Sequence, residues 1–184
     1  MTVWKQSCDE SVFDYMIESQ SGTIDRIVAN EDSTRLFINQ INGVSSIGIY
    51  VIIYFYPKDD TPGCTIETND FNKLLPKFKK LNCEILGISK DSLKSHDKFR
   101  DKYKIKFDLL ADEEIKVLKK YKVWAKKKFM GREFMGIVRT TFLIDKKGKI
   151  IKIWSNVKVK DHAKEVLETL QNIVKNKKKK TPYF

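Results

Sequence analysis

The most continuous hydrophobic run in the chain extends from Ile49 to Tyr56 and consists almost entirely of β-branched and aromatic residues. An uninterrupted run of this kind predicts a strand that is buried on both faces, as in the centre of a sheet with helices on each side. A second short run, residues 84–89, predicts another buried strand. Residues 140–154 predict a hairpin, because two apolar runs flank a turn at Lys146-Lys-Gly148.

Elsewhere in this part of the chain, apolar residues recur at helical spacing. The helix expected at residues 65–80 has Phe71, Leu75 and Phe78 on one side. Three further helices are predicted, at about residues 92–103, 112–121 and 161–174. Asp91 or Ser92 is the expected cap of the first of these three.

The segment before the central strand has a weaker pattern. Residues 12–30 predict short strands around a turn at Ser21-Gly22. From Asp32 on, apolar residues at helical spacing predict a helix that ends at Asn42-Gly43. The order of elements along the whole chain predicts an α/β protein with a central mixed sheet, flanking helices and one antiparallel edge.

Composition narrows the class of protein. The chain has 184 residues, 41% of them hydrophobic, which excludes a disordered chain and predicts one folded domain over residues 1–174. We expect residues 175–184 to form a loose basic tail. The longest apolar run is shorter than the ~20 residues that span a bilayer, and the amino terminus lacks the pattern of a secretory signal. The expected location is therefore the cytoplasm, or the nucleus if Lys175–Lys180 is a nuclear-type signal in a eukaryote, with no membrane contact.

The charge is unevenly distributed. The formal net charge is +12, from 36 Lys and Arg against 24 Asp and Glu. Residues 1–56 carry three basic and seven acidic residues, 3 − 7 = −4, so the rest of the chain carries +16. A basic excess can indicate nucleic-acid binding. Most of these lysines, however, have the spacing of solvated helix faces, and nucleic acid is not the expected partner.

Three cysteines occur, Cys8, Cys64 and Cys83. This sparse, odd number is typical of a reducing compartment and makes a single reactive thiol a candidate. Cys64 follows the loop that leaves the carboxyl end of the central strand, and it lies in the first turn of the next helix, where free N–H groups favour an anion. Lowering the pKa of an ordinary thiol from ~8.5 to ~6 takes ~3.4 kcal/mol, more than the ~2 kcal/mol available from a helix terminus. The best candidate for the additional cation is Arg139, because the strand that follows it could lie beside the central strand.

Residues Tyr54 to Thr65, Tyr-Phe-Tyr-Pro-Lys-Asp-Asp-Thr-Pro-Gly-Cys-Thr, closely resemble the active-site segment of the bacterioferritin-comigratory-protein or peroxiredoxin Q branch of the peroxiredoxins. Gly87-Ile-Ser89, Ser95-His96 and residues 130–145 resemble that branch in order and spacing. The resemblance covers residues 49–174 and leaves the first 45 poorly matched. It implies a thioredoxin-like fold and reduction of hydrogen peroxide and organic hydroperoxides by a cysteine thiolate, with no cofactor.

The resemblance also implies roles for individual residues. Cys64 would be the peroxidatic nucleophile and become a sulfenic acid. The hydroxyl of Thr61 would hydrogen-bond the peroxide, and Pro57 would shield the site from water. Arg139 would hold the thiolate and the polarised peroxide, assisted by the backbone N–H groups of Gly63 and Cys64.

Three further titratable residues have simpler alternatives. Glu67 either orients Arg139 or is an acid on the helix surface. His96 and His162 are expected to be packing or surface residues, because no Cys, His or carboxylate cluster completes a metal site with them. We expect no metal.

A resolving cysteine is missing from both of the positions that the branch uses. The position five residues after Cys64 is Asn69, and the following helix has Arg100 and no cysteine. Cys83 leads into a buried strand, and Cys8 lies in the poorly matched segment. We therefore predict a one-cysteine cycle in which thioredoxin, glutaredoxin or glutathione reduces the sulfenic acid of a monomer or weak dimer, with Cys83 or Cys8 as the alternative.

Two other functions remain as alternatives. One is a non-catalytic thioredoxin-fold module whose basic surface binds nucleic acid or an acidic partner. The other is a disulfide oxidoreductase, which is less favoured because Thr61 stands where a CxxC pair has its first cysteine.

Overall fold

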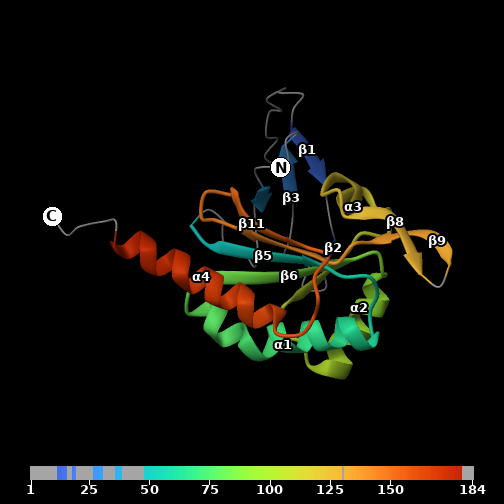
Figure 1. The fold of residues 1–184 in the computed structure, drawn as a ribbon, viewed down its shortest axis with the longest axis horizontal. Helices are drawn as coiled ribbons and strands as arrows, with labels where there is room; N and C mark the ends of the chain where they lie inside the picture. Colours follow the sequence, from blue (N-terminus) through green and yellow to red (C-terminus); the bar gives the residue numbers. More distant parts are fainter. Residues whose placement is uncertain are drawn as a thin grey trace, which may run out of the picture.

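The computed structural model describes residues 12–15, 18–19, 27–30, 36–38, 48–129 and 131–179. At its centre lies a six-stranded sheet with the strand order β11-β10-β5-β6-β7-β2 (Figure 1). The strands of this sheet are β2 (Glu18–Ser19), β5 (Tyr50–Phe55), β6 (Cys83–Ser89), β7 (Asp108–Ala111), β10 (Thr140–Ile144) and β11 (Ile150–Ser155).

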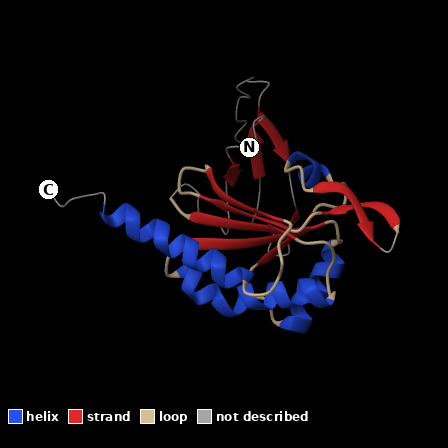
Figure 2. Ribbon diagram, in the orientation of Figure 1, coloured by secondary structure: helices blue, strands red, loops and turns tan. Residues whose placement is uncertain are grey.

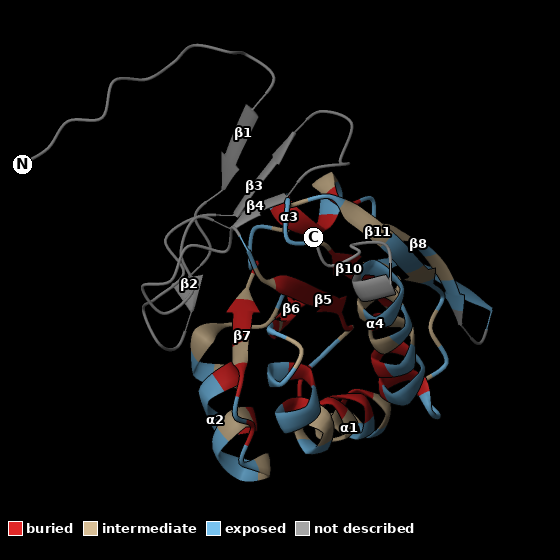
Figure 3. Cartoon of the chain, turned by 90° about the vertical axis from the view of Figure 1, so that its left-hand side faces the viewer, coloured by how far each residue is buried: buried red, intermediate tan, exposed pale blue. Residues whose placement is uncertain are grey.

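Helices cover both faces of this sheet, as Figures 1 and 2 show. Three of them lie on one face: α1 (Pro62–Lys79), α2 (Leu93–Tyr103) and α4 (His162–Lys179). The short helix α3 (Lys116–Lys120) lies on the other. The inward sides of α1 and α4 are buried and their outer sides are exposed (Figure 3). Of the helices described, none is long and apolar enough to cross a membrane.

The central strand β5 explains this layered arrangement. Its six residues are all buried, and alternate side chains enter two different cores. Val51, Ile53 and Phe55 pack toward α3, whereas Ile52 and Tyr54 pack toward α1 and α4. The prediction of a strand buried on both faces is confirmed, because a run without polar positions can only be accommodated between two apolar layers.

The strand directions agree with the predicted mixed sheet and add one element. Strands β5, β6 and β7 are parallel, and β10 and β11 form the predicted antiparallel hairpin. The second edge is antiparallel as well, because β2 pairs with β7 in that direction, so the expectation of a single antiparallel edge is wrong. Strand β10 pairs with β5, with Thr140 opposite Phe55, which confirms that Arg139 lies beside the carboxyl end of the central strand.

The amino-terminal region departs from the prediction at one point. Strands β1 (Val12–Tyr15) and β3 (Ile27–Asn30) confirm the expected short strands, and the turn at residues 21–22 lies outside the described residues. Residues Leu36–Ile38 form strand β4 and pair with β3, so the helix expected from Asp32 is wrong there. Three consecutive apolar residues can form a strand as well as a helix, and pairing with β3 provides the backbone hydrogen bonds of the strand.

Three further differences concern the second half of the chain. Helix α3 is shorter than predicted, because the carboxylate of Asp112 accepts the N–H groups of Lys116 and Leu118 and so fixes its start. Helix α4 continues to Lys179, five residues into the expected loose tail. Strands β8 (Trp124–Phe129) and β9 (Arg132–Ile137) form a hairpin that projects from the body (Figure 1) and was not predicted, because three consecutive lysines interrupt its apolar alternation.

Candidate active site

The candidate site lies at the carboxyl end of β5, where the chain turns into α1. Thr61 is the residue before the helix and has an extended backbone, and Pro62 occupies the first helical position, where a missing N–H is no loss. The first hydrogen bond of the helix joins Thr65 N to Thr61 O at 2.8 Å. The N–H groups of Gly63 and Cys64 come too early in the helix to have an acceptor one turn before them, so they are available to an anion.

The thiol of Cys64 lies against the guanidinium of Arg139. The distance from Arg139 Nη2 to Cys64 Sγ is 3.2 Å, and Cys64 is only 1% exposed. The pairing of β10 with β5 brings Arg139 to this point although 75 residues separate the two in sequence. The sulfur therefore lies beside a fixed cation at the N-terminus of α1, and both of these attract negative charge.

Glu67 completes this cluster from the next turn of α1. Its carboxylate Oε2 accepts from Arg139 Nη1, and its side chain is fully buried, so the expectation of a surface acid is wrong. Burial raises the pKa of Glu67 to about 7, against the opposing effect of the guanidinium. The second oxygen, Oε1, is buried and has no hydrogen-bond partner among the described residues. Glu67 therefore holds one arm of the guanidinium while the other faces the sulfur.

Thr61, Pro57 and Gly63 belong to the loop and the first helical turn that lead to Cys64. The hydroxyl of Thr61 donates to Lys58 O at 3.0 Å, and both Thr61 and Pro57 are half-buried. A Cβ added to Gly63 would lie 3.5 Å from Arg139 Nη2, so the backbone passes directly beside the guanidinium. The structure thus brings Cys64, Arg139, Glu67 and Gly63 into one cluster, with Thr61 and Pro57 in the loop that leads to it.

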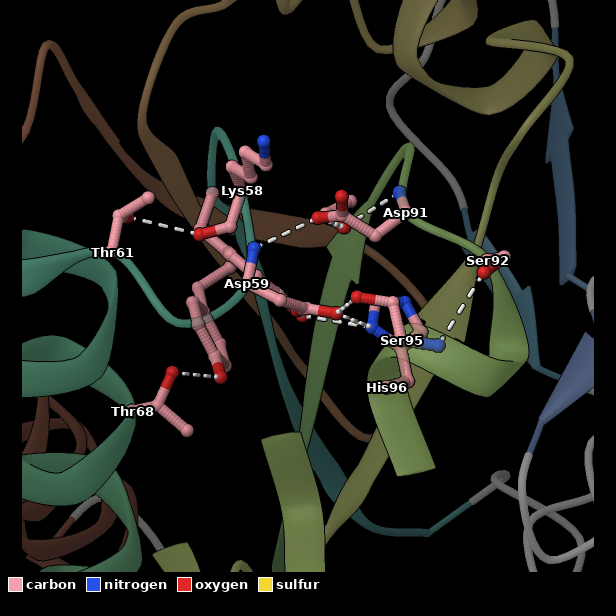
Figure 4. A network of polar contacts seen from close by, with 11 residues as sticks. Lys58, Asp59, Thr61, Thr68, Asp91, Ser92, Ser95 and His96 are labelled. Atoms are coloured by element: carbon pink, nitrogen blue, oxygen red, sulfur yellow. Dashed lines mark hydrogen bonds and ion pairs between the residues drawn. The ribbon is translucent and has the colours of Figure 1, made fainter. Parts of the chain in front are cut away.

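A second set of polar contacts fixes the loop, and sequence analysis missed it (Figure 4). The buried carboxylate of Asp59 accepts from Tyr56 Oη at 2.7 Å and from Ser95 Oγ at 2.7 Å, and His96 Nδ1 lies 2.8 Å from it. The backbone N–H of Asp59 donates to Asp91 Oδ2 at 2.8 Å. The contacts of Asp59 with Asp91, Ser95 and His96 join residues more than 30 positions apart, and no periodic pattern reports such pairs. One signal for them was present in the sequence, the Ser95-His96 pair that resembles the peroxiredoxin branch.

The neighbouring Asp60 adds a further link between the loop and α2. Its carboxylate accepts from Lys102 Nζ at 2.7 Å and from Tyr103 Oη at 2.6 Å. Asp60 has a φ of 53°, a left-handed conformation that Asp tolerates better than most residues. The loop is therefore attached to α2 at both ends of that helix.

The two histidines are buried rather than on the surface. His96 pairs with Asp59, and His162 Nε2 lies 2.8 Å from Thr141 Oγ1. Burial lowers the pKa of His162 to about 4, so this ring is neutral at pH 7. Within the part of the chain that the structure describes, no three His, Cys, Asp or Glu side chains converge as a metal site.

Cys83 is not near Cys64 in the described structure. Cys83 begins β6 opposite Tyr50, at the amino end of β5, whereas Cys64 follows the carboxyl end. Five residues of strand separate these ends by ~16 Å, far more than the ~7 Å between Cα atoms that a disulfide allows. Cys83 is 1% exposed, and burial raises the pKa of its thiol. Cys8 lies outside the described residues.

Comparisons with known proteins add independent observations. The model of the AhpC/TSA family matches residues 35–153. The chain is 50% identical over 126 residues to peroxiredoxin Bcp of Bacillus subtilis strain 168, an alignment that covers 68% of this chain and 80% of that protein. It is 45% identical over 124 residues to peroxiredoxin Bcp of Xanthomonas campestris, covering 67% of this chain and 78% of that protein.

Solved structures of peroxiredoxins of the same branch are also similar to this chain. The bacterioferritin comigratory protein of Xanthomonas campestris, described for its alkyl peroxide reduction activity, is 35% identical and superposes with a TM-score of 0.72 over 94% of this chain and 98% of that chain. A cysteine-to-serine mutant of Xylella fastidiosa PrxQ is 32% identical, with a TM-score of 0.73 over 92% of this chain and 95% of that chain.

Proposed function

Because this chain belongs to the AhpC/TSA family, in the bacterioferritin-comigratory-protein or peroxiredoxin Q branch, we propose that Cys64 is the nucleophile of its peroxidase reaction. The fold is thioredoxin-like, and the activity is thiol-dependent reduction of peroxides; a non-catalytic binding module is not favoured. The observation that supports the assignment of Cys64 is the 3.2 Å contact from Arg139 Nη2 to its sulfur at the N-terminus of α1.

The chemical step follows from a thiolate and a hydroperoxide. The Cys64 thiolate attacks the terminal, hydroxyl-bearing oxygen of the peroxide; an S–O bond forms and the O–O bond breaks. The leaving oxygen departs with the electron pair and takes a proton to give an alcohol, or water when the substrate is hydrogen peroxide. The sulfur is oxidised to a sulfenic acid, and the peroxide is reduced by the same two electrons.

The surrounding donors act on charge that develops as the O–O bond breaks. In this proposal Arg139 stabilises the thiolate and then the departing oxygen, and the N–H groups of Gly63 and Cys64 point toward the same negative charge. Pro57 covers the loop side of the thiol, and the Thr61 hydroxyl binds the peroxide. Glu67 is a positioning residue, because its carboxylate accepts from Arg139 Nη1 while Nη2 faces the sulfur.

The completion of the cycle depends on a second thiol, and we propose that this thiol comes from outside the chain. The distance of Cys83 from Cys64 along β5 supports this proposal, and so does the presence of Asn69 and Arg100 at the two usual resolving positions. An external thiol would condense with the sulfenic acid, releasing water and forming a mixed disulfide. A second thiol would then restore Cys64 by thiol–disulfide exchange. Thioredoxin, glutaredoxin and glutathione are the candidates.

Peroxide consumption by the full chain tests the assignment of the nucleophile. With a thiol reductant present, Cys64→Ser is expected to lose the peroxidase activity, because serine is not ionised at neutral pH. Cys83→Ser is the matched control, since it makes the same exchange at the other buried cysteine. Activity that survives Cys64→Ser would overturn the proposal.

Mass spectrometry after one equivalent of peroxide tests the one-cysteine cycle. The expected product is a sulfenic acid at Cys64, or its adduct with the added thiol. An intramolecular disulfide from Cys64 to Cys83 or Cys8 as the main product would contradict an external reductant. The identity of the thiol that is joined to Cys64 during turnover would identify the reductant.

A further inference from the structure

One peptide group of the loop is held at both of its ends. The N–H of Asp59 donates to Asp91 Oδ2 at 2.8 Å, and the carbonyl of Lys58, in the same peptide group, accepts from Thr61 Oγ1 at 3.0 Å (Figure 4). This peptide bond is trans. In a planar trans peptide the N–H and C=O point in opposite directions, so whatever fixes the N–H also fixes the direction of the carbonyl.

Asp91 is itself held firmly. Ser89, at the end of β6, is fully buried; its hydroxyl donates to Asp91 Oδ2 at 2.8 Å, and its oxygen accepts from Asp91 N at 3.0 Å. Ser92, and not Asp91, caps α2 by accepting from Ser95 N. The Asp91 carboxylate is therefore not needed for the helix cap and is directed toward the loop instead.

The direction of the Lys58 carbonyl determines what the Thr61 hydroxyl can offer to a substrate. A hydroxyl has one proton to donate and two lone pairs that can accept. With its proton committed to Lys58 O, Thr61 Oγ1 presents only lone pairs to the site. A hydroperoxide has an O–H that needs an acceptor, and a hydroxyl locked in the accepting state receives it without first having to rotate.

We propose that Asp91 is a positioning residue for peroxide binding: it holds the Lys58–Asp59 peptide group so that Thr61 accepts the hydroperoxide O–H. This inference rests on the proposed function of Cys64 and Thr61. It assigns to a residue on the far side of the loop, which does not touch the substrate, a role in the orientation of the substrate.

The structure also separates this role from support of the loop as a whole. The carboxylate of Asp59 is bound independently by Tyr56, Ser95 and His96. Removal of the Asp91 carboxylate is therefore expected to leave the loop attached to α2 while the single peptide group is free to turn. For this reason Asp91→Ala should fold, which makes it a suitable test.

The test compares two reactions of Cys64 in the full chain. In Asp91→Ala, the rate of Cys64 oxidation by hydrogen peroxide is expected to fall by about tenfold, less than the ~10²–10³ lost when a transition-state donor is removed outright. The rate of Cys64 alkylation by iodoacetamide, a reaction that does not use Thr61, is expected to change by less than about twofold. Asp91→Asn is expected to recover most of the oxidation rate, because an amide oxygen can still accept from Asp59 N–H.

A double-mutant cycle decides whether Asp91 acts through Thr61. In a Thr61→Val background, Asp91→Ala is expected to cause no further loss of the oxidation rate, because the hydroxyl that it orients is absent. Asp97→Ala is the matched control: it removes an exposed carboxylate of α2 that pairs with Arg100, and it should leave the rate unchanged.

Three outcomes would overturn the inference. These are an unchanged oxidation rate in Asp91→Ala, an equal loss in the Thr61→Val background, and a parallel fall in alkylation, which would indicate general loosening. A wild-type chain that is not oxidised at Cys64 would instead overturn the proposed function, and the role of Asp91 with it. An active wild type with an unaffected Asp91→Ala variant would overturn this inference alone.

Discussion

The two cysteines of the described structure are buried to the same extent and have opposite surroundings. Cys64 and Cys83 are each 1% exposed, and both border the central strand β5. Cys64, at the carboxyl end, faces Arg139 and the N-terminus of α1. Cys83, at the amino end, has a long contact of 3.5 Å from its sulfur to the carbonyl of Glu84, and burial raises the pKa of its thiol.

Burial alone therefore does not distinguish the two thiols. Both thiols are removed from water, and only Cys64 has a cation and the free N–H groups of a helix N-terminus beside its sulfur. The ends of a parallel strand are not equivalent, because a helix begins near the carboxyl end and its N–H groups point back toward the sheet. We therefore expect Cys64 to be the thiol that reacts and Cys83 to be a packing residue.

The largest expected effect is a contrast between the two thiols in one experiment. Brief exposure of the folded protein to hydrogen peroxide should oxidise Cys64 at least ~10³-fold faster than Cys83, because Arg139 and the helix N-terminus act only at Cys64. Mass spectrometry of digested, thiol-trapped samples measures both sites. The contrast should disappear in denaturant, where both thiols are exposed alike. Equal oxidation of the two cysteines in the folded protein would contradict the comparison.

The next largest effect is expected from a change of Arg139, the cation beside Cys64. Arg139→Lys keeps the positive charge but loses the planar fork that contacts Glu67 and Cys64 together, so we expect the rate of Cys64 oxidation to fall by ~10². Stopped-flow measurement of peroxide oxidation gives this rate. Arg132→Lys, at an exposed position on β9, is the matched control and should react like the wild type. A lysine variant with full activity would show that charge alone is sufficient.

A smaller effect should appear in the pH dependence of stability. Burial raises the pKa of Glu67 from 4.5 to about 7, so between these values the folded chain binds more protons than the unfolded chain. The free energy of unfolding should therefore decrease as pH rises through this window, by ~3 kcal/mol at most from this group. Glu67→Gln should remove this decrease, as measured by urea unfolding at several pH values.

The matched control for this prediction is Glu84, the carboxylate beside Cys83. Burial raises the pKa of Glu84 as well, but this residue is only partly buried. We expect Glu84→Gln to remove a smaller part of the pH-dependent decrease than Glu67→Gln does. The same slope in Glu67→Gln as in the wild type would show that the carboxylate is ionised throughout the window.

The smallest effect is expected at Cys83. Cys83→Ala removes one buried sulfur atom and should lower the free energy of unfolding by ~1–2 kcal/mol through the small cavity that it leaves. The peroxidase rate, with an external thiol as reductant, should stay within twofold of the wild type. Thermal unfolding and peroxide consumption measure the two quantities. A large loss of turnover with normal oxidation of Cys64 would assign Cys83 a role in the cycle.

Much of the fold and the central part of the site could be predicted from sequence. The unbroken apolar run of β5 predicted that this strand lies in the centre of the sheet. Arg139 precedes β10, and the expected pairing of β10 with β5 predicted that Arg139 lies near Cys64. These predictions succeeded because each rested on a local pattern that allows only one arrangement in the fold. That residues 1–174 form a single domain remains a prediction.

What the sequence did not reveal depends on contacts between distant polar residues. Asp59 and His96 are 37 residues apart, and Asp91 was considered only as a helix cap, so their contacts with the loop were missed. Glu67 was left between two interpretations, since its burial depends on where β10 places Arg139. A buried polar pair leaves no periodic trace, because its partner is selected by the tertiary structure.

The attachment of α2 to the loop has a consequence for the kinetics of turnover. Ser95 and His96 hold one end of this helix to Asp59, and Lys102 and Tyr103 hold the other end to Asp60. These contacts hold α2 against the loop, and the helix contains no cysteine that could serve as a resolving thiol. In the proposed one-cysteine cycle, the return to the reduced state is then a bimolecular encounter. We expect its rate to rise with the concentration of the external thiol, because no thiol on α2 has to reach Cys64 first.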